Sequence, residues 1–557
     1  MSPSLTSFHA LRASPLALSL GLAFATTPAL AATPDAGQIL QELRSPAPVS
    51  ATRPPALTID SASANAVPEG GSTVRLSAIR LQGNTVFSTP ALEALLADAM
   101  GRDLSFADLT RLAERVTRHY RDAGYLVARA YLPAQQLQGG ELQIAVLEGN
   151  LGEIVIRNPS QLGGSALAPL GQLSLNAPVQ GAALDQALLT LTELPGTRVQ
   201  STLRPGAAVG ASDLLVEVTR ARAFEGGVDL DNFGSSYTGE YRVGTSLYWN
   251  NPTDRGDQLS LRVQASDARL HYERLAYQLP VGTWATRVGA AVSNMHYSLG
   301  KEFATLDADG TAGVASLYLR QPLLRSVDMN WYAQLQYDAK RLRDSIASTD
   351  TTSQQRLHNV VLGLNGDWQD RWLGSASNAL AVNLTLGRLS LDADSAALDA
   401  ASARSAGRFT KLETQLQRVQ ALGAGWAFAL NVRGQAANGN LASVEKMSLG
   451  GSQGVRAYAQ GEALGDSGWL SSAELRWQLS PGWQVQAFGD AGGIKVSETP
   501  WTAASNHRNL KGVGLGATWT FSRTAISLTA AWPIDRDATA LQSDRKPRFW
   551  GQASLAF

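Results

Sequence analysis

The sequence contains no cysteine among its 557 residues, so the chain has no disulfide, no thiolate metal ligand and no cysteine nucleophile. It also lacks an excess of charge of either sign, because 47 basic and 47 acidic residues balance. Nucleic-acid binding needs a basic surface, so nucleic acid is not an expected partner. No phosphate-binding loop is found, and we expect neither a nucleotide nor any other cofactor or metal.

Long apolar runs are missing beyond the N-terminus. The run Pro15–Phe24 follows the basic Arg12 and precedes an Ala-Leu-Ala segment with the small residues Ala29 and Ala31. This order predicts a secretory signal over residues 1–32; a membrane anchor is the alternative, although the run is short for a spanning helix. The rest of the chain has no stretch of about 20 apolar residues, so it can span a membrane only as a closed β-barrel.

Residues 33–45 are predicted to form a short amphipathic helix, followed by a linker rich in proline, alanine and serine over residues 46–73. Ile39, Leu40 and Leu43 fall on one side of this helix. A helix on such a tether can dock at a distant site. The alternative is an N-terminal tail without fixed structure.

Residues 74–149 and 150–222 are predicted to form two small α+β domains, because each segment is long enough for a domain and has its own apolar faces. In both, the predicted order is strand, two helices and two strands. Ser105 is the expected N-cap of a helix over Phe106–Ala123, and Thr89 the expected N-cap of an earlier one. The last two strands are expected over Tyr125–Leu132 and Glu141–Leu147 in the first domain, and over Thr197–Leu203 and Asp213–Arg220 in the second.

From residue 223 to residue 557, helical periodicity gives way to alternation of apolar and polar residues. Trp331, Leu335 and Tyr337, for example, share one face of a predicted strand. The segment predicts a transmembrane β-barrel of about 16 antiparallel strands, with lipid outside and water inside. A soluble all-β protein would also alternate. The secretory signal, the glycines on the polar face and the terminal Phe557 favour the membrane barrel.

Two glycine-flanked motifs each carry one charged residue. The first consists of Gly454, Val455, Arg456, Ala457 and Tyr458, and the second of Phe488, Gly489, Asp490, Ala491 and Gly492. Because Trp483 and Val485 define the apolar face of the second strand, Asp490 is expected to face the lumen. A buried carboxylate needs a partner, so we predict that a loop at about residues 443–468 folds into the pore and pairs Arg456 with Asp490. In the alternative, Arg456 is solvated outside the barrel and Asp490 pairs with a neighbouring strand.

The chain is not predicted to be an enzyme, because no coherent catalytic set is found. Gly450–Gly454 fits the G-x-S-x-G pattern. A nucleophile elbow, however, needs a strand–turn–helix setting with histidine and acidic partners, whereas this segment precedes a β-type loop.

Several short motifs in a fixed order resemble those of one family. They are LQGNTVF (Leu81–Phe87), YRDAGYLVARAYLP (Tyr120–Pro133), LEG (Leu147–Gly149), DNFG (Asp231–Gly234) and NPTDRGDQL (Asn251–Leu259), followed by the two charged motifs. The chain resembles the outer-membrane transporters of two-partner secretion, the hemolysin-activator and filamentous-hemagglutinin-exporter family. The family usually has glycine where this chain has Ala457. If that position needs a positive φ, alanine costs about 1 kcal/mol there.

The resemblance implies a pore in the outer membrane of a Gram-negative bacterium, with the domains 74–149 and 150–222 as periplasmic POTRA domains. It implies export of one large partner protein, such as a hemolysin, adhesin or toxin, whose N-terminal secretion domain the POTRA domains recognise. An extended partner segment can add as a strand to an exposed sheet edge. The candidate edge residues are Tyr125, Val127, Arg129 and Tyr131 in the first domain and Thr197 and Val199 in the second.

The resemblance further implies that the helix at residues 33–45 occupies the pore at rest, that the wall contacts outer-membrane lipid, and that barrel-assembly machinery inserts the chain. A barrel-assembly factor of the same superfamily and a diffusion porin are the alternative functions. Two POTRA domains and a tethered helix favour an exporter over an assembly factor, and porins lack such periplasmic domains.

Overall fold

The computed structural model describes residues 33–43, 57–59, 73–534 and 547–557. The expected secretory signal at residues 1–32 and most of the linker at residues 46–73 lie outside these residues. None of the helices in the described ranges is long and apolar enough to cross a membrane.

The first domain packs two helices against a three-stranded sheet of order β3-β6-β5. Its elements are β2 (Val74–Arg75), β3 (Ala78–Gln82), α2 (Thr89–Leu96), η2 (Ala97–Ala99), β4 (Asp103–Leu104), α3 (Phe106–Asp122), β5 (Arg129–Tyr131), η3 (Gln138–Gly140) and β6 (Glu141–Leu147). Ser105 caps α3 in a capping box with Asp108. The expected cap of α2 is wrong: Ser88 holds the N-cap position, and Thr89 is already helical.

The second domain packs its helices against a four-stranded sheet of order β1-β8-β9-β7. Its elements are β7 (Asn150–Arg157), α4 (Gly164–Leu167), η4 (Ala168–Gln172), α5 (Gly181–Thr192), β8 (Thr197–Pro205) and β9 (Ala211–Arg220). The remaining strand, β1 (Leu57–Ile59), comes from the linker that precedes the first domain and pairs in parallel with β8.

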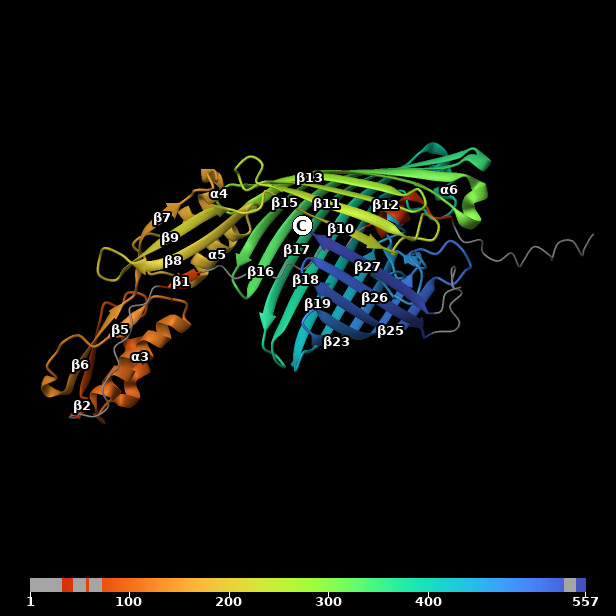
Figure 1. The fold of residues 1–557 in the computed structure, drawn as a ribbon. Coiled ribbons are helices and arrows are strands. Elements are labelled where there is room, and N and C mark those ends of the chain that lie inside the picture. Colours follow the sequence, from red (N-terminus) through yellow and green to blue (C-terminus); the bar gives the residue numbers. More distant parts are fainter. Residues whose placement is uncertain (1–32, 44–56, 60–72, 535–546) are drawn as a thin grey trace, which may run out of the picture. The chain divides into compact units, whose positions relative to one another are not determined.

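In the described residues, sixteen antiparallel strands close into a barrel, which confirms the predicted fold. The strands are β10 (Phe224–Asp231), β11 (Arg242–Asn250), β12 (Gln258–Ser266), β13 (His271–Val281), β14 (Thr286–Ser298), β15 (Ala308–Arg325), β16 (Met329–Ile346), β17 (Thr351–Asp370), β18 (Ala376–Leu391), β19 (Gly407–Gly423), β20 (Trp426–Ala437), β23 (Ser467–Ser480), β24 (Trp483–Lys495), β25 (His507–Phe521), β26 (Thr524–Pro533) and β27 (Arg548–Ala556). The first strand, β10, pairs with the last, β27, and closes the ring (Figure 1).

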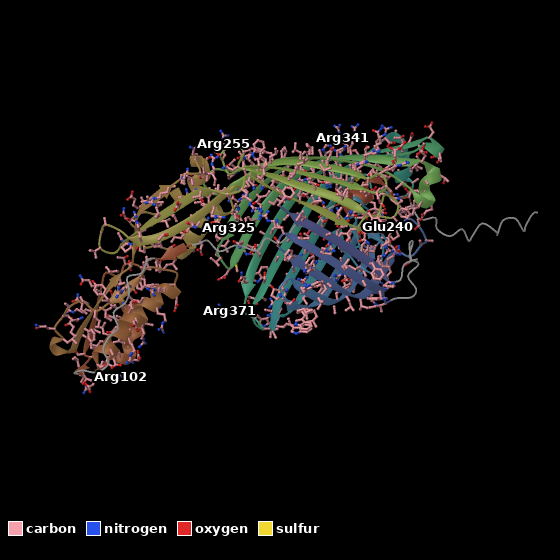
Figure 2. All side chains as sticks on the ribbon, viewed as in Figure 1. Arg102, Glu240, Arg255, Arg325, Arg341 and Arg371 are labelled. Carbon is pink, nitrogen blue, oxygen red and sulfur yellow. The ribbon has the colours of Figure 1, made fainter. Side chains whose placement is uncertain are left out.

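The two ends of the barrel differ. The second domain leads into β10, and this proximal end carries tight turns such as the one at Gly482. The opposite, distal end carries longer connections, which contain η5 (Lys301–Leu306), η6 (Ala347–Thr349) and α6 (Ala393–Ala400). Figure 2 shows Arg255, Arg325 and Arg371 at the proximal end and Glu240 toward the distal end.

The two faces of the wall follow the predicted alternation. On β16, Leu335 and Tyr337 are exposed on the outside, whereas Lys340 is buried inside. On the outer surface the ring of Trp426 stacks on that of Trp477, with centroids 5.3 Å apart. Exposed apolar side chains with stacked aromatics are what a lipid-facing wall requires.

Candidate functional site: a loop and a helix inside the barrel

The connection between β20 and β23 folds back into the barrel as a long segment, residues 438–466, termed here the in-folded loop. It contains η7 (Ser443–Glu445) and a short hairpin of β21 (Met447–Ser448) and β22 (Leu464–Gly465). The predicted bounds, 443–468, overrun its end by two residues because β23 already begins at Ser467. The loop packs its own apolar core against Leu470 and Leu510 of the inner wall.

The tip of the in-folded loop is bound to the wall through Arg456. Its guanidinium donates to both oxygens of Asp490 on β24, at 2.9 Å from Nε and 2.7 Å from Nη2. The backbone N–H of Arg456 donates to the same carboxylate at 3.0 Å. Nη1 donates to Glu474 of β23 at 2.7 Å. The structure therefore brings together the two residues that the sequence pairs, and Arg456 is not a solvated side chain outside the barrel.

This ion pair is shielded from water. Asp490 is 2% exposed, and the Arg456 guanidinium lies over the ring of Phe488, with Cζ 3.4 Å from the ring centroid. Removing one partner of a buried pair costs about 3–5 kcal/mol, because the other charge is left unpaired in a dry site. The tip contact is therefore strong enough to hold the loop in one position.

The other residues of the two motifs shape the contact surface. A Cβ at Gly454 would lie 2.0 Å from the carbonyl oxygen of Leu449, so only glycine fits there. Ala457 does not have a positive φ, so alanine causes no backbone strain at this position. Its methyl group faces Gly512 on β25, where an added Cβ would be only 2.7 Å away. The loop residues Val455 and Tyr458 are buried beside Phe488, Gly492 lies close to Leu449, and Gly489 and Ala491 fall on the opposite face of β24.

The root of the in-folded loop has a second charged anchor, which the sequence analysis missed. Glu445 on η7 is 1% exposed and lies 2.9 Å from Lys411 Nζ of β19 and 2.5 Å from Lys340 Nζ of β16. Asn359 donates to the same carboxylate at 2.8 Å. Both lysines are themselves buried, at 2% and 3% exposure. The polarity is the reverse of that at the tip: here the loop supplies the anion and the wall supplies the cations.

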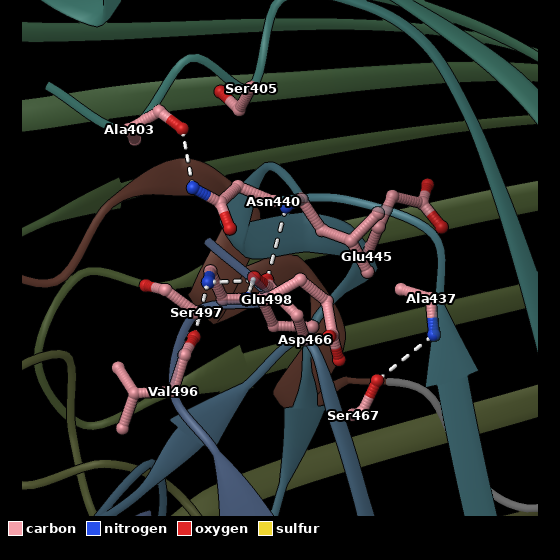
Figure 3. Close-up of polar contacts among 12 residues, drawn as sticks. Ala403, Ser405, Ala437, Asn440, Glu445, Asp466, Ser467, Val496, Ser497 and Glu498 are labelled. Carbon is pink, nitrogen blue, oxygen red and sulfur yellow. Dashed lines mark hydrogen bonds and ion pairs between the residues drawn. The ribbon is translucent and has the colours of Figure 1, made fainter. Parts of the chain in front are cut away.

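A buried aspartate fixes the distal ends of the loop (Figure 3). Asp466 accepts bonds from the backbone N–H of Leu441 at 3.0 Å and of Glu498 at 2.9 Å. Lys446 Nζ donates to it at 2.6 Å. The in-folded loop is thus held at three places: at η7 through Glu445, at its distal ends through Asp466, and at its tip through Arg456.

The predicted N-terminal helix lies inside the barrel as α1 (Ala36–Glu42). Ile39 and Leu40 are buried among wall residues and η7, and Leu43 packs partly buried against the same cluster. An added Cβ at Gly37 would lie 2.7 Å from the backbone nitrogen of Val444, so the helix approaches η7 as closely as a glycine allows. Burial raises the pKa of Glu42, at the end of the helix, to about 7.

Polar contacts hold the first turn of α1. Asp35 caps the helix by accepting from Gln38 N–H at 2.8 Å, and also accepts from Ser443 Oγ of the loop at 2.7 Å. The N–H of Ala36 donates to Asp344 of β16 at 2.7 Å, and Tyr297 donates to the same oxygen at 2.6 Å. The helix is therefore bonded to both the loop and the wall.

A polar cavity of about 330 Å³ opens in the lumen beside α1 and the loop root. Leu40, Leu43 and Glu445 contribute to its lining. The wall contributes amides, hydroxyls and charges, including Gln334, Gln336, Asp338, Asn383 and Thr385. Such a lining can hydrogen-bond water or an unfolded polypeptide without favouring one sequence.

The first candidate partner-binding edge is shorter than predicted. Only Arg129–Tyr131 form a strand, β5, which lies at the sheet edge and pairs with β6. Tyr125 packs its ring against Tyr120, and Val127 packs against the core of the second domain. Burial of these two apolar side chains takes precedence over strand pairing, so the predicted strand Tyr125–Leu132 is wrong before residue 129. Arg129 and Tyr131 are exposed edge residues.

The second candidate edge is partly covered. β1 pairs with Ser201–Leu203 of β8, so the prediction of a free edge over Thr197–Leu203 is wrong for these three residues. The linker itself supplies the neighbouring strand. Thr197 and Val199 lie beyond the paired stretch, and their side chains are buried.

Comparison with known proteins identifies this architecture. A sequence model described as haemolysin secretion/activation protein ShlB/FhaC/HecB matches residues 210–519, and one described as POTRA domain, ShlB-type, matches residues 74–149. The chain belongs to the ShlB/FhaC/HecB family. It is an outer-membrane transporter of two-partner secretion, and its POTRA domains are periplasmic. The proximal end of the barrel therefore faces the periplasm and the distal end faces the cell exterior.

Individual relatives agree with this assignment. The heme/hemopexin transporter protein HuxB of Haemophilus influenzae (strain 86-028NP) is 28% identical over 481 residues, which cover 84% of each chain. The hemolysin transporter protein ShlB of Serratia marcescens is 24% identical, with 86% of this chain and 85% of ShlB covered. The structure of CdiB from Escherichia coli shares the fold, with a TM-score of 0.69, 21% identity and coverage of 94% of this chain and 96% of CdiB.

Proposed function

We propose that the in-folded loop and α1 together form the closed gate of the export pore. The observation that carries this proposal is the double attachment of the first turn of α1. Asp35 is bonded to Ser443 of the loop, and Ala36 is bonded to Asp344 of the wall. If η7 moves, α1 therefore loses its hydrogen bond to Ser443. If α1 then leaves the barrel, the polar lumen beside it becomes exposed.

The transported partner passes through the lumen in an unfolded state. The polar cavity beside α1 offers hydrogen-bonding groups to an extended backbone and has few apolar surfaces that would trap it. Folding of the partner outside the cell prevents its return and gives the movement a direction. No nucleotide is needed for such a mechanism.

The periplasmic domains recognise the N-terminal secretion domain of the partner, and a hemolysin, an adhesin and a toxin all fit this role. At β5 the partner would contact the exposed side chains of Arg129 and Tyr131. The outward-pointing N–H of Ala130 on this edge donates to Thr117 Oγ1 of α3 at 2.8 Å, so strand addition would have to replace that bond. The edge of β8 at residues 201–203 becomes available once β1 leaves it. The outer wall binds outer-membrane lipid, and barrel-assembly machinery inserts the chain.

Conductance of the full-length protein in planar bilayers tests the gate. Deletion of residues 33–43 removes α1, and we expect larger and more frequent open-channel events together with unchanged heat-modifiable mobility of the barrel. The double variant Ile39→Asp/Leu40→Asp is the matched test, because it keeps the helix length and disrupts only its buried face. Closed-state conductance equal to wild type in both variants would exclude α1 as part of the gate.

A further inference from the structure

A basic surface lies on the outside of the barrel, near its distal end. It consists of five exposed arginines on four adjacent strands: Arg341 and Arg343 on β16, Arg356 on β17, Arg388 on β18 and Arg408 on β19. Their sequence neighbours Leu342, Leu357 and Phe409 pack in the cluster around α1, so the arginines face outward. Figure 2 shows Arg341 at the outer edge of the wall.

Strand register places these charges side by side. Arg341 is directly opposite Arg356, and Arg388 is directly opposite Arg408. His358, whose Nδ1 lies 2.8 Å from the Tyr337 hydroxyl, is opposite Arg388 and joins the two pairs into one patch. Like charges directly opposite on neighbouring strands are destabilising. The patch therefore needs a compensating anion.

The described residues do not supply that anion. None of the five arginines forms an ion pair or side-chain hydrogen bond there, and the distal halves of these four strands present no outward-facing carboxylate. Some arginines on the lumenal face, by contrast, have acidic partners: Arg262 pairs with Asp229, and Arg456 pairs with Asp490.

The position of the patch along the barrel shows which layer of the membrane contacts it. The exposed apolar belt ends just below it, with Val360 two residues from His358 and Leu386 two residues from Arg388. Two residues along a strand span about 7 Å. The arginines therefore begin about one headgroup layer beyond the hydrocarbon, on the side that faces the cell exterior.

We propose that this patch binds the phosphate groups of a phosphorylated glycolipid in the outer leaflet of the outer membrane. Guanidinium groups form paired, charge-assisted hydrogen bonds to phosphate oxygens, and adjacent arginines can share one phosphate or hold two. Bound phosphates would neutralise the repulsion between Arg341 and Arg356 and between Arg388 and Arg408. The lipid would thereby tie together β16 to β19, the strands that carry the lysines and Asn359 of the Glu445 anchor.

Native mass spectrometry of the full-length protein in detergent tests the proposal, with bis-phosphorylated lipid A as the probe. The triple variant Arg341→Gln/Arg356→Gln/Arg388→Gln should bind the probe at least about ten-fold more weakly, because several charge-assisted bonds are lost. The control variant Arg255→Gln/Arg371→Gln/Arg523→Gln removes the same charge from turns at the proximal end and should bind as wild type does. Lipid A without its phosphates should not bind to the patch.

Thermal unfolding separates lipid binding from damage to the fold. Without lipid, the triple variant should melt at or above the wild-type temperature, since it loses only repulsive pairs. Added lipid A should raise the melting temperature of wild type and control, but not that of the triple variant. Equal binding by the triple variant, equal binding of dephosphorylated lipid A, or full competition by millimolar inorganic phosphate would each overturn the assignment to a lipid.

Discussion

Glu445 of the in-folded loop and Lys411 of β19 form a buried ion pair, 2.9 Å apart, and Glu445 lies on the same loop as Arg456, whose pair with Asp490 holds the loop tip. The loop therefore carries an anion at its root and a cation at its tip, and the wall carries the complementary charges. A loop shifted along the lumen would leave both kinds of charge unpaired in a dry environment, so the resting position is specified twice.

The root anchor predicts the behaviour of Glu445→Gln. The substitution keeps the shape of the side chain but leaves Lys340 and Lys411 facing each other without their shared carboxylate. Loss of one member of a buried ionic cluster costs about 3–5 kcal/mol, which we expect to appear as a weaker closed gate. Single-channel recording should show a higher open probability, with the barrel still heat-modifiable.

Glu413→Gln is the matched control. Glu413 lies 3.2 Å from the same Lys411, but its side chain is 39% exposed, so water compensates for its loss. If both variants gate like wild type, Glu445 does not hold the closed state.

The Arg456–Asp490 pair at the loop tip predicts that swapping the two charges restores export clearly only when Glu474 is also neutralised. Arg456→Asp and Asp490→Arg should each abolish export, and the double swap should restore the pair. Glu474, however, also accepts from Arg456 and would repel a carboxylate placed at position 456. We therefore expect rescue to be clear with Glu474→Gln in addition, measured as partner protein in the culture medium. Failure of the triple combination to restore any export would exclude a direct functional pair.

Strand geometry explains why the tip pair could be predicted from the sequence. Side chains alternate strictly along a strand, so the apolar Trp483 and Val485 fix the lumenal orientation of Asp490 without knowledge of the fold. The same rule predicted the barrel. Glu445 had no such signal, because it sits in an irregular loop and its partner Lys340 is 105 residues away in the sequence.

The linker strand β1 could not be predicted from the sequence either. β1 has three residues within a proline-rich segment, too few to show a period, and its partner β8 lies in the second domain. The prediction of a strand at Tyr125 and Val127 was wrong for another reason. Their alternation is strand-like, but packing of these side chains decides their conformation: Tyr125 packs in the first domain and Val127 against the second.

Glu42 predicts a pH dependence of the gate. Docked in the barrel, Glu42 has a pKa of about 7, and a released, hydrated carboxyl has its ordinary value near 4.5. The docked helix therefore binds more protons between these values, and docking weakens as the pH rises from about 4.5 to 7. The difference of about 2.5 pKa units allows the docking constant to fall by up to about 300-fold over this window, so we expect the open probability to rise by at least about ten-fold. Glu42→Gln should flatten the profile; an unchanged profile would show that another group titrates.

The covered edge of β8 offers a way to distinguish partner binding at β8 from partner binding at β5. Thr58→Pro should release β1, because proline removes a backbone donor and fixes φ within a strand of only three residues. Amide hydrogen exchange at residues 201–203 should become faster in the full-length protein, whereas Thr58→Val, which keeps the strand, should leave it unchanged. If the partner adds to β8, losing this tethered competitor should tighten binding of its N-terminal secretion domain by up to about ten-fold. Faster exchange with unchanged affinity would assign recognition to Arg129 and Tyr131 on β5 alone.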